Sequence, residues 1–293
     1  MLGRKTSGSV VCTSCGNLVG VSDAVCYNCG RRNPGLWGYA PLLRRLGNDL
    51  GFVPLVVWGS SALYVAMLLA SGLIPGWSIG MNGFSILGPD LRAEFLFGCS
   101  GSEPIFQFGR WWTVLSAGWL HGSLLHIALN MMWVRQLGPA CAELYGAGRM
   151  VIIYTAACVA GFAASSIASW MFPHVPGLLF FLRGGSFTLG ASASIFGLLG
   201  AVVYYGQRSG SSMARREGLQ YALMMGLFGL MMPGIDNWAH AGGFAGGYLM
   251  GKVLDPLRPE RLDHMLIAVG CVLATVAAIV ASLLHGLALF ARG

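Results

Sequence analysis

Long stretches without a charged side chain leave this chain few possible folds. Seven of them lie between consecutive charged residues, and each holds an apolar run near the roughly 20 residues that cross a hydrocarbon core as helix. Lipid offers backbone N–H and C=O groups no partner, so such segments must be helices in a bundle. We therefore expect an all-α polytopic membrane protein. The expected spans are 53–73, 116–137, 149–171, 190–206, 218–234, 236–254 and 265–290.

The basic residues predict how this bundle is oriented. Only 10% of the chain is charged, against roughly 25% in soluble domains, and its net charge of +7 could suit nucleic acid. The positions of the basic residues instead indicate how the chain crosses the membrane. With a cytoplasmic N-terminus and seven spans, only four basic residues lie outside, namely Arg92, Arg110, Arg183 and Arg292. The other fourteen basic residues then face the cytoplasm: Arg4, Lys5, Arg31, Arg32, Arg44, Arg45, Arg135, Arg149, Arg208, Arg215, Arg216, Lys252, Arg258 and Arg261. We expect no nucleic-acid partner.

The N-terminal segment carries half of the eight cysteines, in two CxxC pairs that are each followed by glycine. Residues 1–11 carry two charges and no apolar core, so no signal peptide is expected. Two such pairs separated by ten residues supply the four thiolates of a closed structural Zn²⁺ site. A cytoplasmic location disfavours disulfides. The predicted ligands are Cys12, Cys15, Cys26 and Cys29. The module is either a metal-stabilised fold or a docking element for an unknown partner.

Polar residues inside three spans are the candidates for chemistry, because they are costly in a membrane. His126 and Asn130 are four residues apart and share one helical face, although interhelical bonding alone could explain them. Ser192 follows a glycine-rich stretch and should lie in the first turn of a helix, where free N–H groups favour negative charge. Alone, it is weak support for catalysis.

The sixth span places His240 one turn into a helix and follows it with regularly spaced glycines. Gly243 and Gly247 form a smooth face that lets another helix approach closely. Gly197 and Gly200 of the fourth span could provide the facing surface. Close contact of this kind is what a Ser–His hydrogen bond between two helices requires.

In this order, the three motifs resemble those of the rhomboid intramembrane serine proteases. The resemblance covers roughly residues 105–254, and the matching positions are His121, His126, Asn130, Gly190, Ser192, Ala239, His240, Gly243 and Gly247. The sequence departs from the family pattern at three places. Ala193 follows the serine instead of glycine, Trp112 precedes Thr113 where arginine is usual, and Ala142 takes the place of a glutamate.

The resemblance implies a six-helix core and a serine endopeptidase with a Ser192–His240 dyad, no third acid and no catalytic cofactor. It further implies that His126, Asn130 and the Ser192 backbone N–H hold the oxyanion, that His121 supports them, and that Phe196 stacks on His240. The implied substrates are single-pass membrane proteins, cut within or near their transmembrane helix.

The expected organisation has four parts: a zinc-ribbon-like cytoplasmic module (1–34), a linker (35–51), the rhomboid-like core (52–256) and a seventh transmembrane helix (257–293). The expected location is the bacterial inner membrane. Two other functions are considered. A catalytically inactive rhomboid-like protein would bind transmembrane helices, but it would be expected to lack Ser192 or His240. A transporter or channel is disfavoured because no acidic residue lies mid-span and no inverted repeat is visible.

Overall fold

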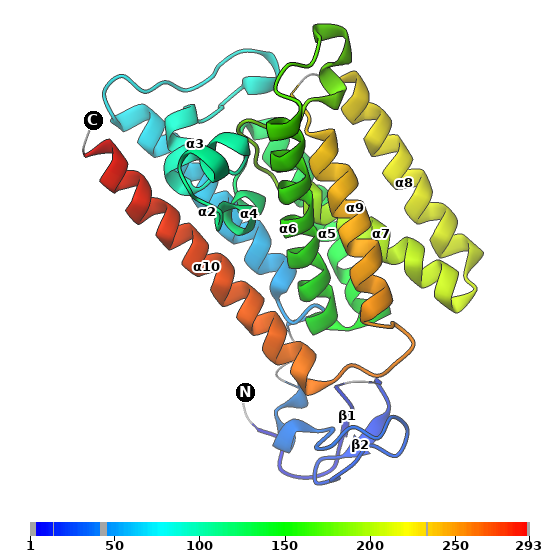
Figure 1. The fold of residues 1–293 in the computed structure, drawn as a ribbon. Helices are drawn as coiled ribbons and strands as arrows, with labels where there is room; N and C mark the ends of the chain where they lie inside the picture. The colour runs from blue at the N-terminus through cyan, green and yellow to red at the C-terminus, as the bar shows by residue number, and fades with distance from the viewer. Residues whose placement is uncertain (1–3, 14, 42–45, 233, 292–293) are drawn as a thin grey trace.

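The structure is a computed structural model that describes residues 4–13, 15–41, 46–232 and 234–291. Arg44, Arg45 and Arg292, which enter the count of basic residues, lie outside this described part. Long helices form a bundle, and a small two-stranded module lies at one end of it (Figure 1). The strands and α-helices are β1 (Ser9–Val11), β2 (Leu18–Gly20), α2 (Phe52–Leu73), α3 (Leu91–Phe97), α4 (Thr113–Ser116), α5 (Leu124–Tyr145), α6 (Ala147–Met171), α7 (Ser192–Ser209), α8 (Ser212–Met231), α9 (Asn237–Val253) and α10 (Leu262–Phe290).

Three of these helices are long and apolar enough to cross a membrane by length and composition, namely α2, α6 and α10. Helices α5 and α8 carry two and three charged residues, α7 ends in polar residues, and α9 has only 17 residues. The number of membrane crossings, seven by our count, therefore stays a prediction.

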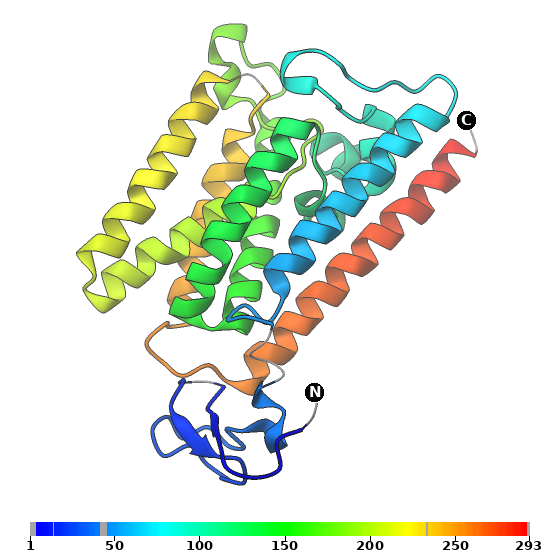
Figure 2. The same cartoon turned by 180° about the vertical axis from the view of Figure 1, so that it is seen from behind.

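Helix α7 lies at the centre of the bundle, where most of its residues are buried. It packs against α5, α6, α8 and α9, and α6 and α9 also pack closely on each other. Helices α8 and α10 lie on opposite flanks in both views (Figures 1 and 2). Of the residues of α8, only Gly218 and Gly229 are buried. Helices α6 and α7 are the most buried of the long helices, and α7 carries Ser192.

The second predicted span, 116–137, is wrong in its boundaries. The helix begins at Leu124 and continues to Tyr145, because Ser123 caps it by accepting a hydrogen bond from the His126 backbone N–H at 3.2 Å. The preceding residues form short helical turns, α4 and a 3₁₀ turn at Ala117–Trp119. His121 therefore lies in the connection before the helix and not within it.

Helix α10 is fastened to the segment that connects α2 with α5. The fully buried Arg110 guanidinium donates to the backbone oxygen of Phe95 at 2.6 Å and to that of Ser282 on α10 at 2.9 Å. The Trp112 ring N–H donates to the Ser282 hydroxyl at 3.1 Å. A buried cation needs such partners because it has left water. Arg110 thus joins α3 to the C-terminal helix.

The N-terminal module sits against the end of the bundle that carries the α5–α6 turn and the α9–α10 connection. Strands β1 and β2 pair antiparallel, with Val10 opposite Val19. The Asn48 side chain donates to Glu143 at 3.1 Å. A cavity of about 250 Å³ separates the module from the bundle, and both Cys15 and Cys29 line it. This module and the last turns of α10 lie at opposite ends of the molecule (Figure 1).

Candidate active site

Ser192 is the first residue of α7, and Gly190 sets the path of the backbone into this helix. Gly190 has a φ of +125°, a conformation that costs glycine little. A Cβ at this position would also lie 2.6 Å from His126 Nε2. The Gly190 N–H donates to the Ala117 oxygen at 2.9 Å. Ser192 is therefore held in a first helical turn, where backbone N–H groups have no intrahelical partner.

His240 lies in the first turn of α9 and faces Ser192. Its Nε2 atom is 3.0 Å from Ser192 Oγ, and the imidazole is buried. The Phe196 ring stacks on it, with 4.2 Å between ring centroids and 15° between planes. Within the described part of the chain, His240 Nδ1 has no hydrogen-bond partner. The arrangement is a pair, since no carboxylate there contacts this ring nitrogen.

Glycine makes the close approach of α7 and α9 feasible. A Cβ added at Gly247 would overlap the Gly197 carbonyl, and one added at Gly243 would overlap the Ala193 carbonyl. On the facing helix, a Cβ at Gly200 would overlap the Phe244 carbonyl. The two backbones are thus in direct contact along the length of the interface, as small residues permit. This contact brings Ser192 within hydrogen-bond distance of His240.

The hydrogen bonds of His126 indicate which ring nitrogen carries its proton. Nδ1 accepts from the Gly122 backbone N–H at 3.3 Å, so in a neutral ring the proton resides on Nε2. Nε2 is the atom that lies against Gly190. His126 therefore offers an N–H donor next to the turn that leads into Ser192.

Asn130 and His121 take different positions beside His126. The Asn130 amide donates to the His126 backbone oxygen at 2.8 Å, which uses one of its two N–H bonds. His121 is completely buried, its Nε2 accepts from the Ala191 N–H at 3.5 Å, and its ring packs edge-on against His126. His121 thus supports the backbone just before Ser192, whereas His126 and Asn130 lie together on α5.

Ser194 points away from this site. Its hydroxyl is fully buried and donates to the Tyr154 backbone oxygen on α6 at 2.9 Å. Two residues on a helix differ in direction by about 200°. Only Ser192 of the two faces His240.

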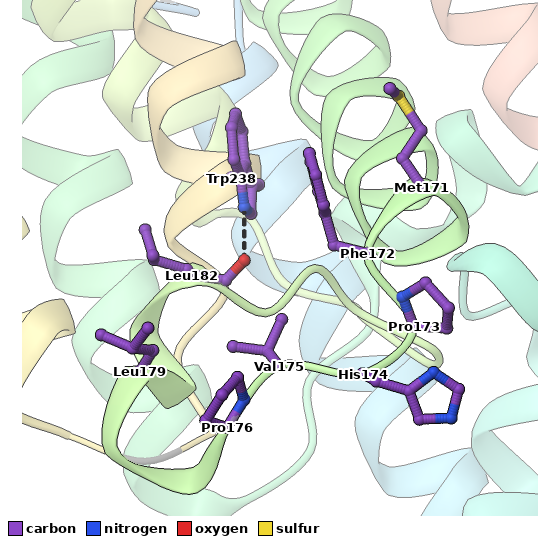
Figure 3. A pocket seen from close by; sticks show the side chains of 9 residues that line it. All are labelled: Met171, Phe172, Pro173, His174, Val175, Pro176, Leu179, Leu182 and Trp238. Carbon is purple, nitrogen blue, oxygen red and sulfur yellow. Dashed lines mark hydrogen bonds between the residues drawn. The ribbon is translucent and has the colours of Figure 1, made fainter.

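A cavity lined by the loop after α6 and by Trp238 is a separate feature. It measures about 460 Å³ and is lined by Met171, Phe172, Pro173, His174, Val175, Pro176, Leu179, Leu182 and Trp238 (Figure 3). The Trp238 ring N–H donates to the Leu182 oxygen at 2.8 Å, which ties α9 to the loop after α6. Trp238 precedes His240 by two residues and so points to another side of α9. We do not assign this cavity to the dyad.

The four N-terminal cysteines converge on one point. The Sγ atoms of Cys12 and Cys29 are 3.8 Å apart, those of Cys15 and Cys26 are 3.6 Å apart, and all four lie within 4.8 Å of one another. Tetrahedral zinc with Zn–S bonds of about 2.3 Å requires sulfur–sulfur separations of about 3.8 Å. The cluster is therefore compatible with a Cys₄ zinc site.

A group of polar residues beside the dyad was not predicted from the sequence. The hydroxyls of Thr188 and Ser165 both donate to the Asp236 carboxylate. The sequence contained one signal, an aspartate three residues before Ala239, which is the spacing of a helix N-cap. Its partners on other segments, 48 and 71 residues away, could not be identified from the sequence.

The fold and the site together define a helical membrane protein with a serine–histidine pair between two buried helices. The family model of the Rhomboid domain matches residues 108–256, which is just over half of the chain. This chain belongs to the rhomboid family, and it is an integral membrane protein. The matched region begins at residue 108, so the family match does not include the cysteine cluster.

Named relatives include proteases and proteins without that name. The chain is 30% identical to Rhomboid protease GluP of Bacillus subtilis (strain 168), over 65% of its own length and 34% of that protein. It is 29% identical to RHOMBOID-like protein 4 of Arabidopsis thaliana, over 58% and 40%. It is also 29% identical to Rhomboid protease GlpG of Serratia proteamaculans (strain 568), over 56% and 55%. The matches thus span between a third and a little over half of these relatives.

Proposed function

We propose that this chain is an intramembrane serine endopeptidase that cuts single-pass membrane proteins within or near their transmembrane helix. The observation that carries the proposal is the 3.0 Å contact between Ser192 Oγ and His240 Nε2, with Phe196 stacked on the imidazole. A serine becomes a nucleophile when an adjacent base can accept its proton. Further support comes from two relatives that are named rhomboid proteases.

The proposed reaction begins with attack of Ser192 Oγ on a peptide carbonyl carbon, while His240 Nε2 accepts the hydroxyl proton. The tetrahedral oxyanion accepts hydrogen bonds from His126 Nε2–H, from the second N–H of the Asn130 amide and from the Ser192 backbone N–H. As the C–N bond breaks, His240 returns the proton to the departing amine. Water then attacks the acyl-enzyme, His240 accepts its proton, and the acid product leaves as Ser192 is reprotonated.

We also propose how the chain sits in its membrane and what the N-terminal module holds. Seven crossings with a cytoplasmic N-terminus place fourteen basic residues inside and four outside, and a bacterial inner membrane fits this arrangement. The module would hold one structural Zn²⁺ through Cys12, Cys15, Cys26 and Cys29, since their sulfur spacing fits that ion. Bound there, zinc would supply folding energy to a segment too small for a core of its own.

The test of the catalytic proposal uses a fluorophosphonate probe and a single-pass membrane substrate in detergent or liposomes. Ser192→Ala and His240→Ala should each abolish labelling and cleavage without unfolding the protein. Asn130→Ala should lower cleavage by on the order of 10²-fold, as expected for one donor among three. Ser194→Ala should retain most activity, because its hydroxyl bonds to α6.

Two results would decide against the proposal. If Ser194→Ala were inactive and Ser192→Ala cleaved normally, the wrong serine would have been assigned. If the unaltered protein neither labelled nor cleaved but still bound the substrate helix, it would be the non-catalytic helix-binding protein considered above.

A further inference from the structure

Next to the dyad, a second hydrogen-bonded contact joins the start of α9 to the segment that leads into α7. Asp236 caps α9, and one of its carboxylate oxygens accepts from the Ala239 backbone N–H at 3.0 Å. The other oxygen accepts from the Thr188 hydroxyl at 2.7 Å and from the Ser165 hydroxyl on α6. A single carboxylate therefore connects the start of the histidine helix with α6 and with the segment that leads into the serine helix.

The contact between Thr188 and Asp236 lies four residues before the dyad on both segments. Thr188 precedes Ser192 by four residues, and Asp236 precedes His240 by four residues. The Thr188–Asp236 bond crosses between the same two segments as the Ser192–His240 bond. The relative position of the two segments is thus fixed at two points.

The Thr188 side of this contact is itself held in place. Its backbone N–H donates to the Ser100 oxygen at 2.8 Å, and its oxygen accepts from the Ser100 N–H at 2.9 Å. This pairing anchors Thr188 to the segment after α3. A shift of Thr188 relative to Asp236 would therefore require several hydrogen bonds to break together.

Gly185 and Ser165 complete the network. The Ser165 hydroxyl accepts from the Gly185 N–H at 2.8 Å while it donates to Asp236. A Cβ at Gly185 would lie 2.6 Å from the Thr188 Cβ and 3.0 Å from an Asp236 carboxylate oxygen. Only a residue without a side chain allows the loop to approach this closely. A satisfied polar network of this kind is rigid, because each member orients the next.

Asp236 does not act as a third catalytic acid. Its bonds go to Ala239, Thr188 and Ser165, and its backbone oxygen accepts from the His240 backbone N–H at 3.1 Å. The His240 ring nitrogen that a triad acid would contact, Nδ1, has no partner within the described ranges. Any effect of this carboxylate on the dyad must be transmitted through the position of α9.

We propose that Asp236, together with Thr188, is a positioning residue for the dyad. Its carboxylate fixes α9 against the segment before Ser192, so that His240 Nε2 stays within hydrogen-bond distance of Ser192 Oγ. This inference rests on the proposed proteolytic function. Displacement of a reacting group by 1 Å costs up to about 10²-fold in rate, so loss of this contact should slow the chemical step.

The test compares Thr188→Val, which removes the hydroxyl at nearly constant shape, with Thr188→Ser, which retains it. Thr188→Val should lower kcat and the rate of fluorophosphonate labelling by on the order of tenfold with little change in KM. Thr188→Ser should restore most of both rates. Thr275→Val on α10 is the matched control, because its hydroxyl bonds only within its own helix and its loss should change neither rate.

A double variant separates positioning from general destabilisation. Asp236→Ala alone should lower kcat, and addition of Thr188→Val to it should cause little further loss, since the shared contact is already gone. Multiplicative losses, or wild-type kcat and labelling for Thr188→Val, would overturn the inference while the proteolytic function stood. An unaltered protein that neither labelled nor cleaved would overturn both.

Discussion

A methyl group added to α6 should separate the catalytic pair without touching either member. Gly161 lies where α6 meets both helices of the dyad. A Cβ there would lie 2.6 Å from the Ala239 oxygen and 2.7 Å from the Ala193 Cβ. Ala239 precedes His240 and Ala193 follows Ser192. The substitution Gly161→Ala therefore pushes on both catalytic segments at positions next to the reacting side chains.

The size of the effect follows from these distances. Carbon atoms in contact prefer about 3.5–4.0 Å, so relief of the overlap requires movements of about 1 Å. A movement of this size would lengthen the present 3.0 Å contact between His240 Nε2 and Ser192 Oγ to about 4 Å, which is no longer a hydrogen bond. We expect a loss of about 10²-fold in kcat. Overpacking should also cost about 1–3 kcal/mol of stability, partly offset by the higher helix propensity of alanine, about 1 kcal/mol.

The same substitution in an open position provides the control. A Cβ at Gly270 on α10 would meet nothing within 4 Å, so Gly270→Ala should leave activity unchanged. Cleavage of a single-pass substrate, labelling by a fluorophosphonate and thermal unfolding would be measured on both variants. Wild-type cleavage and labelling by Gly161→Ala would contradict this prediction, because they would mean that α6 does not constrain the dyad.

Three further predictions concern the metal, the topology and the C-terminal helix. Chelation or Cys12→Ser should release about one zinc per chain and unfold the N-terminal module while the bundle stays folded; protein from zinc-replete cells that contains no stoichiometric metal would contradict this. Reporter fusions should place the N-terminus and the loop 207–217 in the cytoplasm and the C-terminus on the other side; both ends in one compartment would mean a miscounted span. Arg110→Leu should lower the unfolding free energy by about 1–3 kcal/mol, because it removes charge-assisted bonds to Phe95 and Ser282. Ser282→Ala keeps the backbone acceptor and should lower the unfolding free energy by less. Equal losses of stability in thermal unfolding would mean that the Arg110 hydrogen bonds do not hold α10 in place.

The helical membrane architecture could be predicted because it depends on properties that are local in the sequence. A run of apolar residues near the thickness of a bilayer has one stable backbone solution, and the runs at 53–73 and 149–171 lie close to the observed α2 and α6. The predicted start of α5 is wrong, since the stretch without charged residues continues through 116–123. The Ser123 cap at its start is set by the backbone path, which hydropathy does not report.

For the candidate site, too, one part could be predicted from the sequence and another could not. The candidate residues could be identified from the sequence, because an ionisable or hydroxyl side chain in an apolar segment is costly, and His126, Ser192 and His240 are such residues. The sequence also shows that the cysteines at 12, 15, 26 and 29 have metal-ligand spacing. Both inferences depend on short sequence patterns: a polar residue within an apolar run, and two CxxC pairs.

Which groups meet across the bundle became visible in the three-dimensional structure alone. The closure of α7 on α9 depends on backbone contact at Gly197 and Gly247, and the network around Asp236 joins residues up to 71 positions apart. Arg110 reaches Ser282 across 172 positions. Hydrogen bonds of this kind depend on where packed helices place their atoms to within a few tenths of an ångström. No local pattern encodes that placement, because it results from the packing of the whole bundle.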